Sequence, residues 1–115
     1  MLWDVAAMTA ARALDGLHQR GEVRAHNIAN SDTPGFRAQH VDFERTLADA
    51  VRRGDPATAT ADVVASPTII DGMGNSVDLE TELIGSMEDA LLRDTVTAAF
   101  NFKAAQLRLA FGGRR

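Results

Sequence analysis

The chain has 115 residues, with 12 basic and 16 acidic side chains, a formal net charge of −4 and no cysteine. Its length fits one small domain, its mild acidity argues against a nucleic-acid-binding protein, and the lack of cysteine excludes a disulfide framework, a zinc–thiolate site and a thiol nucleophile. No run approaches the roughly 18 apolar residues of a membrane span, and Asp4 interrupts the apolar start where a cleaved signal peptide would need a continuous run.

Small and apolar residues recur every three or four positions through the N-terminal segment. This spacing predicts an amphipathic helix over residues 1–30, with a seam long enough for a coiled-coil contact. Gly16 and Gly21 each lower helix stability by about 1 kcal/mol relative to alanine, so the helix is weak alone. The seam consists of Trp3, Ala7, Ala10, Leu14, Leu17, Gly21, Ala25 and Ile28.

The last third of the chain repeats the pattern and predicts a second helix over residues 77–113. Acidic residues near its start suit the positive end of the helix dipole, and Gly112-Gly113 end it. Its apolar stripe consists of Ile84, Met87, Leu91, Thr95, Ala98, Phe102, Ala105 and Leu109, and a neighbouring ridge contains Leu92, Val96, Phe100, Leu107 and Phe111.

The two stripes predict a mainly α fold within a single domain, residues 1–115, in which the long terminal helices pair as an antiparallel coiled-coil hairpin. The segment between the helices, about 45 residues, is too short to bury both stripes. In one interpretation each stripe covers the other; in a second, both stripes also contact neighbours in an assembly. The predicted helix-interface residues are Leu14, Leu17, Ile28, Ile84, Met87, Leu91, Phe102 and Leu109.

The middle segment, residues 31–76, is polar and irregular in pattern. Proline and glycine mark turns, because proline presets one backbone dihedral and glycine accepts positive φ. Pro67 restricts its surroundings to an edge strand or an irregular segment. In chain order the predicted pieces are a turn at Ser31–Gly35, a short helix at Val41–Val51 that Gly54-Asp55-Pro56 ends, an extended segment at Val63–Ile70 and a second turn at Asp71–Asn75.

The best candidates for chemistry are Asp15, His18, Glu22 and His26. Two imidazoles and a carboxylate can bind a divalent ion, but His18 and His26 lie two turns apart, roughly 12 Å along the helix axis, which one metal ion does not bridge easily. The chain also lacks a nucleophile elbow, a phosphate loop and a dinucleotide fingerprint. We therefore expect a solvated polar face here, no catalytic, metal-binding or cofactor-binding residue, and no enzyme activity.

Two motifs frame the middle segment. Asn27-Ile28-Ala29-Asn30 precedes Ser31 and then Asp32-Thr33-Pro34-Gly35-Phe36, and Asn75-Ser76-Val77-Asp78-Leu79-Glu80 leads into the second helix. Asparagine exchanges hydrogen bonds with the backbone where a helix stops and tolerates left-handed conformations. We expect the turn to present Phe36 to a neighbouring surface. An ordinary helix end followed by a loop accounts for the first motif alone, and the second motif argues against that interpretation.

The two motifs, in this order, resemble the signature of flagellar basal-body rod proteins, and Asp32, Arg37 and the Asp42-Phe43 pair are similar to the proximal-rod members of that family. The resemblance implies a structural subunit, without catalysis or cofactor, that leaves the cell by the flagellar type III export apparatus, without a cleaved signal peptide, and reaches the rod in the periplasmic space. It implies polymerisation through the terminal helices, which line the axial channel. The implied partners are copies of the chain, other rod proteins and membrane-ring or rod-adaptor proteins, with no nucleic acid or small-molecule substrate.

Three alternatives stay open at this point. The nearest is another rod protein of the same family, of the FlgC type. The second is a helical adaptor unrelated to flagella, and the third is a helical metal enzyme built on His18, Glu22 and His26.

Overall fold

The computed structural model describes residues 2–66 and 70–112. The predicted mainly α fold with two long terminal helices is confirmed. The side chain of Trp3, residues 67–69 of the predicted extended segment, and Gly113 lie outside the described part. The elements in chain order are α1 (Leu2–Ala29), β1 (Gln39–Asp42), α2 (Glu44–Arg52), the 3-10 turn η1 (Pro56–Thr58), β2 (Asp62–Ala65) and α3 (Leu79–Gly112).

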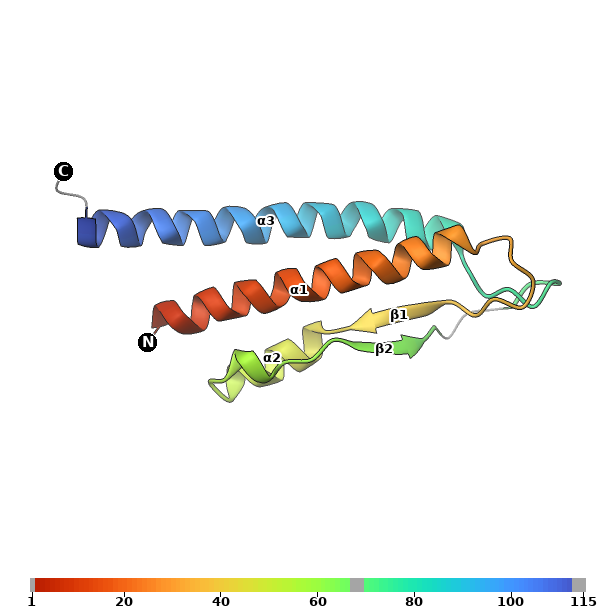
Figure 1. Cartoon of the computed structure of the whole chain (residues 1–115), viewed down its shortest axis with the longest axis horizontal. Coiled ribbons are helices and arrows are strands. Elements are labelled where there is room, and N and C mark those ends of the chain that lie inside the picture. The colour runs from red at the N-terminus through yellow and green to blue at the C-terminus, as the bar shows by residue number, and fades with distance from the viewer. Residues whose placement is uncertain (1, 67–69, 113–115) are drawn as a thin grey trace.

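The molecule is an elongated stack of three layers, with extents of 65 × 29 × 14 Å. Figure 1 shows α1 in the middle, with α3 along one side and the β1–β2 hairpin and α2 along the other. The helices α1 and α3 run antiparallel, lie close together at the end where the middle segment joins them, and diverge toward their free ends. The last turns of α3 extend past the N-terminal end of α1 (Figure 1).

A small apolar core lies between α1 and the hairpin. It consists of Leu17 of α1, Val41 of β1 and Phe43, all at most 4% exposed. Gly16 lets the Phe43 ring approach α1, since a Cβ at position 16 would lie 2.5 Å from ring carbons. The Arg20 guanidinium lies over the same ring, 4.8 Å from its centroid. The Phe43 ring therefore packs against two residues of α1, Gly16 and Arg20, and holds the hairpin side against that helix.

The structure corrects the predicted helix at Val41–Val51. Residues 39–42 form β1, which pairs antiparallel with β2 so that Val41 lies opposite Val63, and α2 begins only at Glu44. Val41 and Phe43 are two positions apart and both buried, which is the period of a strand and not of a helix. The extended segment predicted from Val63 is confirmed over residues 63–65, the described part that forms β2.

The apolar stripes of the two long helices do not cover each other. Leu17 is fully buried and packs against Val41 and Phe43 on the hairpin side, while Leu14 and Ile28 are half-buried. All five α3 residues of the predicted interface are exposed: Ile84 (50%), Met87 (68%), Leu91 (69%), Phe102 (65%) and Leu109 (74%).

The predicted antiparallel pairing of α1 and α3 is therefore confirmed, but this pairing does not bury the apolar stripe of α3. The buried positions of α3 are Glu82, Gly85 and Asp89, which follow one another at helical spacing and are not apolar side chains. The apolar stripe lies on a different face of α3, away from α1. Among the described residues, no helix combines the length and the apolar character that crossing a membrane requires.

Candidate functional site

The first motif stops α1 through the backbone and side chain of Asn30. Its backbone N–H and its side-chain Nδ2 both donate to the carbonyl of His26, at 3.2 and 2.9 Å, and its Oδ1 accepts from the Thr33 hydroxyl at 3.0 Å. The Thr33 N–H donates to the Asn30 carbonyl at 3.1 Å. Because the last carbonyls of a helix have no partner inside the helix, these bonds satisfy the helix end and start the turn together.

The turn that follows is bonded to the second motif. Gly35 has a φ of +78°, a conformation that favours glycine, and its N–H donates to the Met73 carbonyl at 2.9 Å. The half-buried Phe36 packs edge-on against His26, with ring centroids 5.4 Å apart. Phe36 thus has a partner within the chain, and its presentation to a neighbouring surface stays a proposal.

Asn75 links the second motif to the first by hydrogen bonds. Its side chain is buried, and its Nδ2 donates to the carbonyls of Asn30 and Thr33, both at 2.8 Å. Its Oδ1 accepts from the Val77 N–H at 2.8 Å, so the amide makes three of the four hydrogen bonds available to it. One side chain thereby satisfies two carbonyls of the first motif, which gives a physical reason for the two motifs to occur together.

Asn27 and Ser76 connect this region to the hairpin. Asn27 pairs with the backbone of Gln39, donating from Nδ2 to its carbonyl at 2.7 Å and accepting its N–H on Oδ1 at 3.2 Å. Ser76 Oγ accepts from the Ala38 N–H at 2.7 Å, and the Ser76 N–H donates to the Phe36 carbonyl at 3.0 Å. The end of α1, the start of β1 and the approach to α3 therefore meet in one region, residues 27–39 with residues 71–78, which we call the joint.

Asp78 starts α3. Its Oδ1 accepts from the Thr81 N–H at 3.2 Å, which satisfies one of the free N–H groups at a helix N-terminus. Hydrogen bonds from Thr81 hold the pKa of this exposed carboxyl below its ordinary value of 3.8. The acid of the second motif is therefore a helix cap, and α3 begins at the next residue, Leu79.

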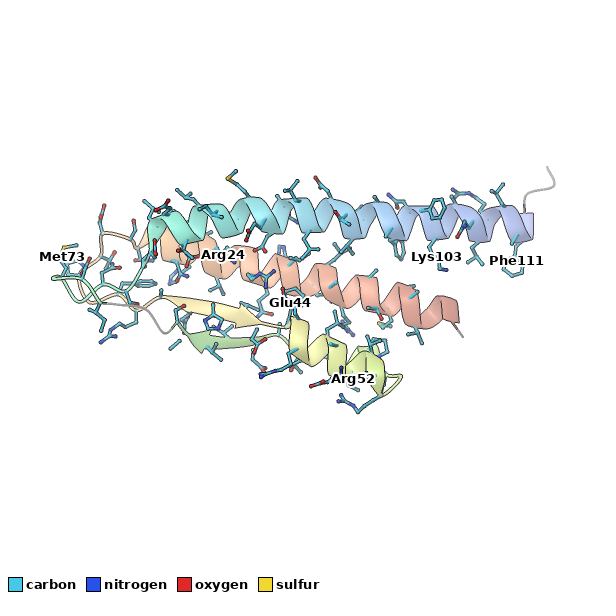
Figure 2. The ribbon with its side chains drawn as sticks, turned by 180° about the vertical axis from the view of Figure 1, so that it is seen from behind. Arg24, Glu44, Arg52, Met73, Lys103 and Phe111 are labelled. Carbon is cyan, nitrogen blue, oxygen red and sulfur yellow. The ribbon has the colours of Figure 1, made fainter. Side chains whose placement is uncertain are left out.

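Behind the joint, largely buried ion pairs hold α1 against α3. Arg20 donates to the Asp89 carboxylate from Nη2 and Nε at 2.8 and 3.1 Å, and Arg24 Nε donates to the same carboxylate at 2.9 Å. Arg24 Nη1 also reaches Glu82 at 3.3 Å, and Arg20 Nη1 reaches Glu44 of α2 at 2.7 Å. Figure 2 labels Arg24 on α1 and Glu44 on α2. We call Arg20, Arg24, Glu82 and Asp89 the ion cluster.

Competing effects set the ionisation of this cluster. Burial alone would raise the pKa of Asp89, but hydrogen bonds from Arg20 and Arg24 outweigh it and hold that pKa below 3.8. Burial likewise opposes the charge of Arg20, yet its hydrogen bonds to Asp89 and Glu44 raise its pKa above the ordinary value. Arg20 and Asp89 therefore carry opposite charges near neutral pH, so that each of these two buried charges has a partner.

The ion cluster and the joint form one continuous network. Asn27 Nδ2 donates to Glu82 Oε2 at 3.1 Å, in addition to its bond with the hairpin. Gly85 gives Arg24 the room to reach its acids, because a Cβ at position 85 would lie 2.4 Å from the guanidinium carbon. Polar contacts thus connect α1, α3 and the hairpin, in addition to the apolar core that packs the hairpin against α1.

Gly85 and the ion cluster were not predicted from the sequence, and Ser76 was noted there only as a member of the second motif. A signal for the cluster exists, since Arg20 and Arg24 are four residues apart, Glu82 and Asp89 are seven apart, and both spacings place two like charges on one helix face. The apolar stripe on another face of α3 is the stronger pattern, and it led to the prediction of a different contact face.

The remaining predicted motif residues do not all contribute to the joint through their side chains. Ile28 and Ala29 belong to the last turn of α1, and Asp32, Pro34 and Leu79 are exposed. Asp42 pairs with Arg45 on the surface at 3.0 Å, and Phe43 belongs to the apolar core. The motif residues that the structure brings together are Asn27, Asn30, Thr33, Gly35, Phe36, Asn75, Ser76 and Val77.

The four candidate ligands on α1 are spread along a solvated face. His18 Nε2 lies 3.6 Å from Glu22 Oε2 with both side chains largely exposed, and Asp15 pairs with Arg12 at 3.0 Å. His26 packs on Phe36. Within residues 2–66 and 70–112, no three ligating side chains gather in a way that would hold a metal ion.

Comparisons with known proteins agree with the motifs. The family model of the flagella basal body rod protein matches residues 8–37, the part of the chain that runs from α1 through the first turn of the joint. The flagellar basal body rod protein FlgB of Aeromonas hydrophila is 30% identical over 118 residues, which cover 90% of this chain and 89% of that protein. The chain belongs to the FlgB family of flagellar basal body rod proteins.

Other FlgB relatives match over shorter spans. FlgB of Salmonella typhimurium is 32% identical over 102 residues, covering 69% of this chain and 72% of that protein. FlgB of Escherichia coli is 40% identical over 65 residues, so this chain spans about half of that relative's length, 47%. All three relatives carry the name flagellar basal body rod protein FlgB.

Proposed function

We propose that this protein is a structural subunit of the proximal part of the flagellar rod and polymerises there through its terminal helices. The observation that carries the proposal is the exposed apolar stripe on α3: Ile84, Met87, Leu91, Phe102 and Leu109 are each at least 50% exposed. Large contiguous apolar surfaces on soluble domains mark interaction sites. In a rod-family chain, neighbouring rod subunits are the natural partners of such a surface.

Hydrogen bonds of the joint and of the ion cluster hold the first part of α3, which carries the start of this stripe, against α1. Asn27, Asn30 and Asn75 connect the end of α1 to the start of α3, and the ion cluster aligns the two helices along their first turns beyond the joint. The free ends carry no comparable polar network among the described residues. Ordering of these ends on contact with neighbours fits a subunit whose assembly is coupled to folding.

The remaining roles follow from the family. The chain would contribute to the axial drive shaft and to the wall of the export channel, in the periplasmic space, after passage through the flagellar type III export apparatus without a cleaved signal peptide. Its partners would be copies of itself, other rod proteins, and membrane-ring or rod-adaptor proteins of the basal body. No nucleic acid, small-molecule substrate or catalytic step is part of this proposal. The FlgB names of the relatives favour the proximal rod over a position of the FlgC type.

Deletion of the gene tests the proposal. The deletion strain should not swim, and its basal bodies should stop at the membrane ring, because distal parts have no base on which to assemble. Expression of the intact gene from a plasmid should restore both swimming and complete basal bodies. Normal filaments in the deletion strain would contradict the proposed function.

A further inference from the structure

The charge of α3 changes sign along its length. Its first half, residues 79–94, contains five acidic residues and one arginine, whereas its second half, residues 95–112, contains two basic residues and no acid. Arg20 and Arg24 neutralise two of the acids, Glu82 and Asp89. Glu80, Glu88 and Asp94 remain, and no ion pair joins any of these three to another residue within the described ranges.

Leu91 protrudes between two of these unpaired acids. It is 69% exposed, and Glu88 and Asp94 lie three residues before and after it, so both acids are its neighbours on the helix surface. Met87, 68% exposed, lies one turn earlier on the same stripe. This part of α3 therefore presents large apolar side chains flanked by negative charge.

A groove lined mostly by small side chains and by one lysine lies at the free end of the same molecule, where α1 and α3 diverge. It has a volume of about 190 Å³ and is lined by Ala6, Ala7, Ala10, Ala99, Phe100 and Lys103. It continues as an apolar surface over Met8 and Ala11. Lys103, labelled on α3 in Figure 2, has no ion-pair partner in the part of the chain that the structure describes. We call this the free-end groove.

We propose that the free-end groove of one copy receives Leu91 of a second copy, with Lys103 of the first copy between Glu88 and Asp94 of the second. The contact rests on the proposed function as a rod subunit and specifies which surfaces of neighbouring copies meet. Large side chains on one surface fill a groove of mostly small residues on the other, and acids meet a lysine. A contact between two identical α3 stripes around Leu91 would instead bring Glu88 of one copy near Asp94 of the other, and like charges oppose such pairing.

The two surfaces are different parts of the chain, so the contact is head-to-tail. Such heterologous contacts generate rings or open helical assemblies and not closed dimers. Leu91 and Ala99 are eight residues apart on α3, which is about 12 Å along the helix axis. Each copy would therefore be displaced along the long axis of its neighbour, as a growing rod requires.

Cysteine cross-linking tests this contact without background, because the chain contains no cysteine. Leu91→Cys and Ala7→Cys would be expressed together in the deletion strain, and isolated basal bodies would be treated with a short bismaleimide. Each variant alone, and the exposed position Ala57→Cys, serve as controls. Circular dichroism of the purified variants checks that helix content is unchanged.

We expect a cross-linked dimer from the mixture and none from either variant alone. Adding Lys103→Glu to the Ala7→Cys copy should lower the yield by roughly fivefold, the equivalent of one ion pair, and Glu88→Lys in the Leu91→Cys copy should restore it. A dimer from Leu91→Cys alone, or no dimer although both variants are present in basal bodies, overturns the head-to-tail contact and leaves the rod function intact. Absence of the Ala57→Cys subunit from basal bodies would overturn the proposed function, and this contact with it.

Discussion

Asn75 is the residue on which the joint depends most directly. It is buried, and its amide is the hydrogen-bond donor for two carbonyls of the first motif, those of Asn30 and Thr33. Because the Asn75 side chain is itself buried, a carboxylate in its place would be a buried charge facing two carbonyl oxygens, which costs more free energy than the loss of the two hydrogen bonds alone. The conformation of the turn at residues 30–36 therefore depends on a side chain more than forty positions later.

Replacement of this amide gives a first prediction. Asn75→Asp keeps the size of the side chain but removes both donated hydrogen bonds and places a negative charge beside two carbonyl oxygens. We expect the free energy of unfolding to fall by about 2–4 kcal/mol, measured by urea denaturation. Asn101→Asp, which makes the same change at an exposed position of α3, should change stability by less than about 0.5 kcal/mol. Equal effects of the two variants would show that Asn75 does not hold the joint.

Two glycines of α1 give a second prediction at this scale. Glycine in a helix interior is destabilising relative to alanine by about 0.5–1 kcal/mol, so Gly21→Ala, where no atom lies within 4 Å of the added Cβ, should stabilise the protein by that amount. Gly16→Ala should destabilise it, because the added Cβ would lie 2.5 Å from the buried Phe43 ring. Thermal unfolding of the two variants should shift in opposite directions, and a stabilised Gly16→Ala protein would contradict the close contact between α1 and Phe43.

At the scale of the elements, α1 is held differently on its two sides. Leu17, Val41 and Phe43 form an apolar contact with the hairpin, whereas the ion cluster forms the contact with α3. Truncating one member of a buried ion pair leaves an uncompensated charge and is strongly destabilising. The α1–α3 contact is therefore sensitive to pH and to charge.

The lowered pKa of Asp89 predicts the direction of this pH dependence. Because its folded pKa lies below the ordinary value of 3.8, the unfolded chain binds the proton more readily, and the ionised pair contributes stability above that value. The contribution should be lost as pH falls through about 4 toward the folded pKa. Asp89→Asn should lower the free energy of unfolding at pH 7 by about 2–4 kcal/mol and flatten its decline between roughly pH 5 and 2. Urea denaturation across this range measures both effects, and an unchanged slope would contradict the role of Asp89.

The sequence predicted where these elements begin and end better than it predicted which face of each element is buried. The periodicity of α1 and α3 located both helices to within two residues of the observed bounds in the described part, and Pro34 and Gly35 located the first turn. It failed for the hairpin because β1 has only four residues, too few for a strand period to stand out beside a helix pattern. It failed for the α3 face because an apolar stripe indicates a contact but not whether the partner is the same chain or a neighbour.

At the scale of the whole molecule, polar contacts dominate at the joint, whereas apolar surface dominates at the free ends. Asn27, Asn75 and the ion cluster fix one end through polar contacts, while the other end carries an apolar groove and α3 extends past α1. The motif residues were recognisable in the sequence as a pair of signatures. Their geometry was not, since the bond from Asn75 to Asn30 spans 45 positions and leaves no periodic trace.

That this chain is a subunit of the rod can be tested most directly by locating it in purified basal bodies. The exposed Ala57 in η1 would be replaced by the chain's only cysteine, labelled with maleimide-linked gold, in a deletion strain whose swimming the variant restores. Electron microscopy should then show the label on the rod, between the membrane ring and the hook. Label on the hook or the filament, or absence of label from the basal bodies of swimming cells, would show that the chain is not a rod subunit.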